Sequence, residues 1–264
     1  MTGMTAYGEQ GSVIFTTESS SPIFLGKAKA VSSDGFDDHH QYQSYYGVYT
    51  PKLRGVTYTF QAPNSGTVIP FVKTKGFCCI QFCQRQANNV WRIKIFTEVG
   101  VGANIPEIYC FGPPENADIK EGSAGLVVYD REGKVTFSTE QRHIKPIGIG
   151  TVLSGPNTGG GSAYRFNTFP VPWGRQQSWT APMFSTPKGT PLVFMNSTEM
   201  SQVRTGSIMY YHVGYLRAVR ASRGQIEVRW GEPQFSYRLP FDWGNLYGSS
   251  QYCNVIVLDS DDYD

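Results

Sequence analysis

The sequence has little charge, few histidines and no long hydrophobic run. Charged residues make up 17% of the 264 residues and the net charge is +2, which indicates neither a nucleic-acid-binding surface nor an acidic scaffold. Four histidines are a small supply for catalysis, and the motifs Gly-x-Ser-x-Gly and His-Glu-x-x-His do not occur. No apolar stretch approaches the roughly 18 residues of a membrane-spanning helix, so no membrane insertion is expected.

The N-terminal residues and the cysteines indicate a protein that is not secreted by the Sec route. Residues 1–5 lack the basic and then apolar regions of a signal peptide. Five cysteines is an odd number, and they lie in apolar segments without a Cys-x-x-Cys pair, which favours buried reduced thiols over disulfides. The alternative is a metal or iron–sulfur site. The ligands of such a site would be Cys78, Cys83, Cys110 and Cys253, and the fifth cysteine, Cys79, would not take part. We expect no metal and no cofactor.

What the sequence does contain is typical of an all-β protein. It has 29 glycines, 16 prolines and 14% aromatic residues. In residues 90–96, Trp91, Ile93 and Ile95 alternate with basic residues, which is the period of a half-buried antiparallel strand. Residues 225–230 repeat the pattern, and turn residues precede both segments.

The beginning of the sequence is repeated 122 residues later. Residues 11–18 (GSVIFTTE) resemble residues 133–140 (GKVTFSTE). Three later pairs of segments also match: 66–71 with 189–194, the strand at Trp91 with that at Ile226, and 108–111 with 255–258. Such self-similarity predicts related structural units. We therefore expect two tandem β-sandwich-like domains, residues 1–118 and 119–264, joined by a polar, proline-rich connection.

No catalytic constellation can be assembled from the sequence. Asp37, Asp38, His39 and His40 form a dense polar cluster that favours a solvated turn over a metal site. A glycoside hydrolase would need two facing carboxylates, and the candidates are Glu98 and Glu107, which flank a glycine-rich loop, and Glu227, which points outward on its expected strand. Aromatic residues are the candidates for interface or receptor contact, with core packing as the alternative. They are Tyr42, Tyr45, Tyr46, Tyr49, Phe166, Phe169, Trp173 and Trp179.

Residues 125–138 (GLVVYDREGKVTFS) are predicted to form a tight hairpin in which Gly133 takes a positive φ. This hairpin resembles the opening hairpin of many small tail proteins of tailed bacteriophages, and residues 6–15 resemble it more loosely. The resemblance implies a virion protein of the tail tip, baseplate or fibre, built from β-sandwiches and present as a ring or trimer. It implies no catalytic residues.

The expected function is that of a non-enzymatic tail component, assembled in the host cytoplasm and located in the virion tail. Its expected partners are copies of itself and other tail proteins, and a glycan or protein of the host surface as receptor. Repeated display would let weak receptor contacts add up to firm attachment. The alternatives are a carbohydrate-binding receptor-recognition module and, less favoured, a glycoside hydrolase.

Overall fold

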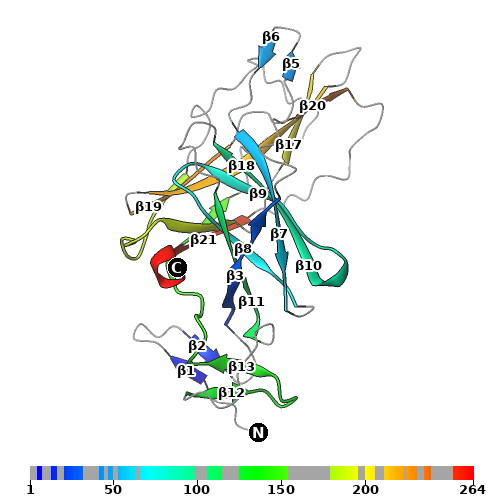
Figure 1. Ribbon diagram of the computed structural model, residues 1–264. Helices are drawn as coiled ribbons and strands as arrows, with labels where there is room; N and C mark the ends of the chain where they lie inside the picture. Colours follow the sequence, from blue (N-terminus) through cyan, green and yellow to red (C-terminus); the bar gives the residue numbers. More distant parts are fainter. Residues whose placement is uncertain are drawn as a thin grey trace.

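The computed structural model describes fifteen segments of the chain, and in them every element except two short 3₁₀ helices is a β strand (Figure 1). The all-β prediction is confirmed. No helix in the described part of the chain is long and apolar enough to cross a membrane. The described residues are 5–7, 13–16, 21–31, 42–44, 47–49, 53–63, 66–98, 106–114, 125–153, 179–195, 200–205, 211–222, 224–230, 235–238 and 252–264.

A six-stranded antiparallel sheet, here called sheet B, runs in the order β14-β21-β16-β8-β11-β3. Its strands come from both halves of the chain, so most strands that pair in the sheet are far apart in the sequence. The strands are β3 (Ile23–Lys27), β8 (Ile69–Lys73), β11 (Glu107–Gly112), β14 (Pro146–Leu153), β16 (Pro191–Met195) and β21 (Tyr252–Asp259).

A nine-stranded sheet, here called sheet C, has the main order β15-β19-β18-β9-β10-β7-β4, with β17 and β20 pairing the first part of the long strand β18. The strands are β4 (Lys29–Ala30), β7 (Leu53–Gln61), β9 (Cys78–Arg85), β10 (Val90–Glu98), β15 (Trp179–Pro182), β17 (Met200–Thr205), β18 (Tyr211–Ser222), β19 (Gln225–Trp230) and β20 (Phe235–Arg238). The 3₁₀ helix η1 (Ala87–Asn89) joins β9 to β10 and holds Asn88 and Asn89 at positive φ. The turn predicted before Trp91 is thus confirmed.

Three two-stranded hairpins complete the described elements: β1 (Thr5–Tyr7) with β2 (Val13–Thr16), β12 (Val127–Tyr129) with β13 (Val135–Ser138), and β5 (Tyr42–Ser44) with β6 (Gly47–Tyr49). The first two lie side by side below the sheets, and β2 contacts β13 (Figure 1). In the turn of β12–β13, Gly133 has φ +80° as predicted, and the Asp130 carboxylate accepts hydrogen bonds from the backbone of Glu132 and Lys134, both at 2.8 Å.

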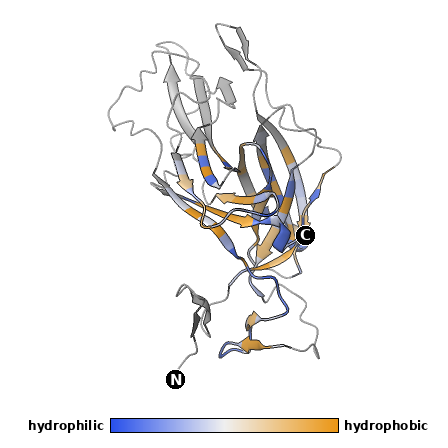
Figure 2. Ribbon diagram, turned by 90° about the vertical axis from the view of Figure 1, so that its left-hand side faces the viewer, coloured by the Kyte–Doolittle hydropathy of each residue, from blue (hydrophilic) through white to orange (hydrophobic). Residues whose placement is uncertain are grey.

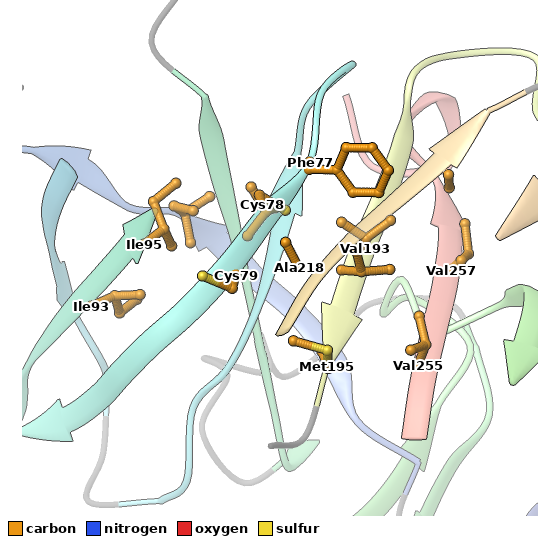
Figure 3. Close-up of a cluster of buried hydrophobic side chains, with 14 of the residues drawn as sticks. Phe77, Cys78, Cys79, Ile93, Ile95, Val193, Met195, Ala218, Val255 and Val257 are labelled. Atoms are coloured by element: carbon orange, nitrogen blue, oxygen red, sulfur yellow. The ribbon is translucent and has the colours of Figure 1, made fainter. Parts of the chain in front are cut away.

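The main hydrophobic core fills the space between sheets B and C. Val193 and Val257 reach it from sheet B, and Ile93 and Ile95 reach it from sheet C, each almost completely buried (Figure 3). Val72 of sheet B is buried in the same core. The predicted inward faces at Ile93 and Ile95, and at Ile226 and Val228, are therefore confirmed. Hydrophobic and hydrophilic residues alternate along the strands, as a strand with two different faces requires (Figure 2).

A second, mostly aromatic cluster covers the opposite face of sheet B, here called its outer face. Because neighbouring residues of a strand point to opposite faces, Phe71 and Tyr109 lie on this face while Val72 and Ile108 enter the main core. Phe24 of β3 belongs to the same face and packs against Tyr109, whereas Ile144 and Tyr263, which lie outside the strands of the sheet, pack over the cluster. Its other members are Phe111, Leu192 and Leu258, with Ile69, Phe194 and Ile256 at its margin.

The strand order of both sheets is symmetrical about their centres. In sheet B the first half of the chain supplies β8-β11-β3 and the second half supplies β16-β21-β14, in mirrored order. In sheet C, β9-β10-β7 is mirrored by β18-β19-β15. The central pairs β8–β16 and β9–β18 are both antiparallel, as an approximate two-fold axis through the two sheets would produce. The sequence matches fall on the equivalent strands β8 and β16, β10 and β19, and β11 and β21, which supports an internal duplication.

The two halves do not form separate sandwiches, which differs from our expectation for residues 1–118 and 119–264. β8 pairs with β16 across the predicted boundary, and Val193 lies opposite Val72. The rings of Phe71 and Phe194, equivalent residues in the repeat, meet at 5.3 Å. The main core also draws on both halves. The halves are therefore repeats that share two sheets and one core, because the edge strand of each finds its partner in the other.

Replacing Phe71 by Ala should destabilise the whole molecule. Phe71 is completely buried at the junction of the halves, and a Phe→Ala change in a core costs about 3–5 kcal/mol. We expect one cooperative transition in chemical denaturation, shifted as a unit, because the core is shared. Phe194→Ala, at the less buried equivalent position, should shift it less. Two transitions, only one of them shifted, would contradict a shared core.

Candidate interaction surfaces

The predicted contact aromatics are only partly placed by the structure. Tyr42 begins β5 and lies opposite Tyr49, the last residue of β6. Trp179 begins β15 and lies opposite Val228 of β19. The remaining candidates, Tyr45, Tyr46, Phe166, Phe169 and Trp173, lie outside the described residues. Their role in contacts therefore stays a prediction.

Four large apolar side chains are exposed in the described residues, and sequence reasoning selected none of them. Leu126 is 50%, Tyr129 54%, Ile149 47% and Phe184 70% exposed. They fall in two places, which are the hairpin β12–β13 and the edge of sheet B formed by β14. Exposed apolar side chains gathered at one site mark surfaces for contact with other molecules. The exposed apolar edge at β14 has one sequence feature that points to it, which is the uncharged run of residues 146–153.

The edge at β14 is built by close packing on its inner side. Gly148 faces the main core, where an added Cβ would meet Met183 at 3.0 Å and Ile226 at 3.2 Å. Ile149 lies opposite Ile256, and its side chain therefore points to the outer face. Phe184 lies beside the same strand, because its backbone N–H donates to Ile147 O at 2.7 Å. The edge thus presents apolar side chains next to a strand backbone.

A cluster of charged groups lies at the opposite end of the outer face. The carboxylate of Asp264 accepts hydrogen bonds from Lys27 Nζ at 2.6 Å, from Lys73 Nζ at 2.7 Å and from the Tyr109 hydroxyl. Lys27 also donates to Glu107 at 2.9 Å and lies 4.5 Å from the centre of the Tyr109 ring. Residues from β3, β8 and β11 thus converge on one carboxylate.

These contacts stabilise the ionised forms of the cluster. Burial by itself would raise the pKa of the Asp264 carboxyl, but the hydrogen bonds from Lys27, Lys73 and Tyr109 outweigh it, and the pKa lies well below its ordinary value. Burial would likewise lower the pKa of Lys27 and of Lys73, yet the bonds to Asp264 and Tyr109 leave the pKa of both ammonium groups raised. The cluster fixes residues 259–264 to the first half of the chain.

Tyr263 holds the same segment against the aromatic cluster. Its ring meets that of Phe111 edge-on at 4.9 Å, its hydroxyl donates to His143 O, and Lys145 N donates to that hydroxyl, both at 2.9 Å. Burial raises the pKa of Tyr263 to about 12. The short 3₁₀ helix η3 (Ser260–Asp262) places this ring over the sheet. The segment is therefore a built part of the fold and covers sheet B.

The candidate carboxylates for glycoside hydrolysis that the structure describes, Glu107 and Glu227, lie in separate ion pairs. Glu107 lies in the ion cluster with Lys27, and Glu227 pairs with Arg220 at 2.6 Å. Glu98 is the last residue of β10, and its side chain is outside the described set. The separation of Glu98 and Glu107, which would indicate a hydrolase, therefore stays untested.

Cys78, Cys79 and Cys110 lie in the main core, and Cys83 packs against it. Burial raises the pKa of Cys83 to about 12 and the pKa of Cys78 and Cys110 well above the ordinary thiol value. A metal ligand must be a thiolate, which this environment disfavours. The described residues contain no group of three potential metal ligands. The side chain of Cys253 and the cluster at 37–40 lie outside the described set.

Comparisons with protein-family models, with curated proteins and with solved structures found no match to this chain.

The Asp264→Asn variant should be less stable than the unchanged chain at pH 7, by at most about 1 kcal/mol because the ion cluster is partly exposed. The pKa of Asp264 is lower in the folded state than in the unfolded state. The carboxylate therefore contributes fully to the free energy of unfolding above its ordinary pKa of 3.8, and this contribution is lost as the pH falls through the folded-state pKa. The stability difference should therefore shrink below pH 3.8. Asp262→Asn, an exposed neighbour, is the control, and an equal or pH-independent loss in both variants would contradict this role. Urea unfolding across the pH range measures it.

Proposed function

We propose that this chain is a non-enzymatic structural component of the tail of a tailed bacteriophage, at the tail tip, baseplate or fibre. It assembles through contacts between subunits and contributes to attachment to the host. Its partners are copies of itself, as a trimer or ring, and other tail proteins, with a glycan or protein of the host surface as receptor. It is assembled in the host cytoplasm, where thiols such as Cys78 and Cys110 stay reduced.

The observation that carries this proposal is the hairpin β12–β13. Its sequence is the one that resembles the opening hairpin of phage tail proteins, and its turn has the predicted geometry at Gly133. One side of it is buried through Val128 and Thr136, while Leu126 and Tyr129 are about half exposed. An element that is anchored on one side and apolar on the other is suited to contact with a neighbouring subunit.

The duplication adds support, because it supplies the contact element twice. The hairpins β1–β2 and β12–β13 occupy equivalent places in the two halves and lie against each other (Figure 1). Repeated contact elements in one chain suit a particle built from many copies, since each subunit then offers more than one point of attachment.

A carbohydrate-binding role is the second candidate, and one observation favours it. Tyr42 and Tyr49 are cross-strand partners in the β5–β6 hairpin. The hairpin thus has aromatic residues at two directly opposite backbone positions, and aromatic residues are the type on which sugar rings stack. Saturable binding to a glycan array that Tyr42→Ala and Tyr49→Ala both weaken is the result expected of this candidate.

Antibodies raised against the purified chain should label the tails of phage particles from the source culture. Gold particles at the tail tip, baseplate or fibre in electron micrographs are the expected result, with antibody absorbed on the chain as the control. Label on the capsid, or no label on any particle, would contradict the proposal.

Tyr129→Lys should lower incorporation of the chain into particles by about tenfold, because a charge would have to be buried where an apolar ring makes contact. The variant is supplied in trans to a phage that lacks the gene, and the chain is quantified in purified particles. Glu132→Gln, in the exposed turn of the same hairpin, should be incorporated normally. Normal incorporation of Tyr129→Lys would show that the hairpin is not a contact element.

A further inference from the structure

Among the described strands, β14 at the edge of sheet B has a partner on one side only. β14 is eight residues long and carries no charged residue. It pairs with β21 on one side. On its other side, within the described residues, its backbone is used only through Ile147 O, which accepts from Phe184 N at 2.7 Å and from Ser185 N at 3.3 Å. Beyond Ile147 no described residue bonds to this side of the strand, whose backbone groups are of the kind that a further strand can pair.

The opposite edge of the same sheet is closed to such pairing. β3 has five residues, its Gly26 has φ +139°, and the register of its pairing with β11 shifts between Cys110 and Phe111. The chain then leaves the sheet at Ala28 and enters β4, which pairs with β7 of sheet C. Short, irregular strands that turn out of a sheet are a common way of blocking edge pairing. Sheet B therefore has one edge suited to extension.

The side chains at the open edge are also suited to a partner. Ile149 is exposed on the outer face beside Ile256, and Phe184 is the most exposed of the large apolar residues at 70%. The flanking charge, Lys145, precedes the strand and stays outside the segment that would pair. An exposed, uncharged edge strand is matched best by a strand of the same kind.

We propose that β14 pairs antiparallel with β14 of a second copy of this chain, so that sheet B continues across a two-fold axis. The chain already joins its own halves in this way, because the equivalent strands β8 and β16 pair antiparallel at the centre of the sheet. Because the described part of sheet B has one such edge, the contact between two copies of sheet B is self-complementary and closes at two, whereas a head-to-tail chain of these sheets would need a second open edge. This pairing uses a different surface from the hairpin β12–β13, which is the contact element proposed for the trimer or ring, so the inference goes beyond the proposed function and does not depend on it.

The test is the absolute mass of the full chain by light scattering over a concentration series. The unchanged chain should approach twice its 29.4 kDa as the concentration rises. Ile149→Lys would place a lysine from each copy on the same face of the new pair, among apolar side chains, and the dissociation constant of the dimer should rise at least about tenfold. Thr67→Lys is the matched control, since it adds the same charge at an exposed site outside both β14 and the hairpin β12–β13 and should dimerise like the unchanged chain.

Hydrogen exchange locates the contact. Amides of residues 147–153 should exchange more slowly at high concentration in the unchanged chain and in Thr67→Lys, but not in Ile149→Lys. A monomer at every concentration, association unaffected by Ile149→Lys, or exchange at residues 147–153 that does not depend on concentration would each overturn edge pairing. None of these outcomes bears on antibody labelling of tails, so failure of this inference and failure of the proposed function remain distinguishable.

Discussion

The antiparallel pairing of β8 with β16 is the contact on which the rest of the structure depends. It places Val193 opposite Val72 on the core side and brings Phe71 against Phe194 on the outer side. Without it, sheet B would divide into two three-stranded sheets, each with an unpaired edge in the middle of the molecule. Small sheets bury too little apolar surface to be stable alone, so the repeats are stable as one body.

The shared sheets also determine what can cover their outer face. The outer face of sheet B carries a mostly aromatic cluster that includes Phe71 and Leu258. Segments far away in the sequence pack over this cluster and shield it from water. Ile144 comes from the segment between β13 and β14, and Tyr263 from the segment after β21. The ion cluster at Asp264 fixes the position of residues 259–264 on the sheet, because Lys27 and Lys73 can both bind its carboxylate only when this segment lies in its observed place. Apolar burial thus supplies the main stabilisation and the charges fix the position.

The symmetry of the repeat is broken at the edges, and the difference has consequences for assembly. β3 and β14 are equivalent in strand order, yet β3 bends at Gly26 toward sheet C whereas β14 continues as an uncharged strand. Loops and edges vary at little cost as long as the core strands keep their pairing. Among the described residues, one repeat therefore closes its edge of the sheet, whereas the other ends in a strand paired on one side only, and the exposed residues Ile149 and Phe184 lie beside that strand.

The sequence by itself determined the class of the fold, the faces of its strands and its repeat. Alternation at Trp91, Ile93 and Ile95 shows which side of a strand is buried, and Gly133 shows where a hairpin turns, because both are local properties of the backbone. Partner choice is not local. The period of two is the same whichever strand lies alongside, so the sequence could not show that β8 pairs with β16 rather than ending a separate domain. For the same reason only the tertiary structure decided that Lys27 meets Asp264 and that Ile149 is left exposed at an edge, since both depend on which segments the shared core brings together.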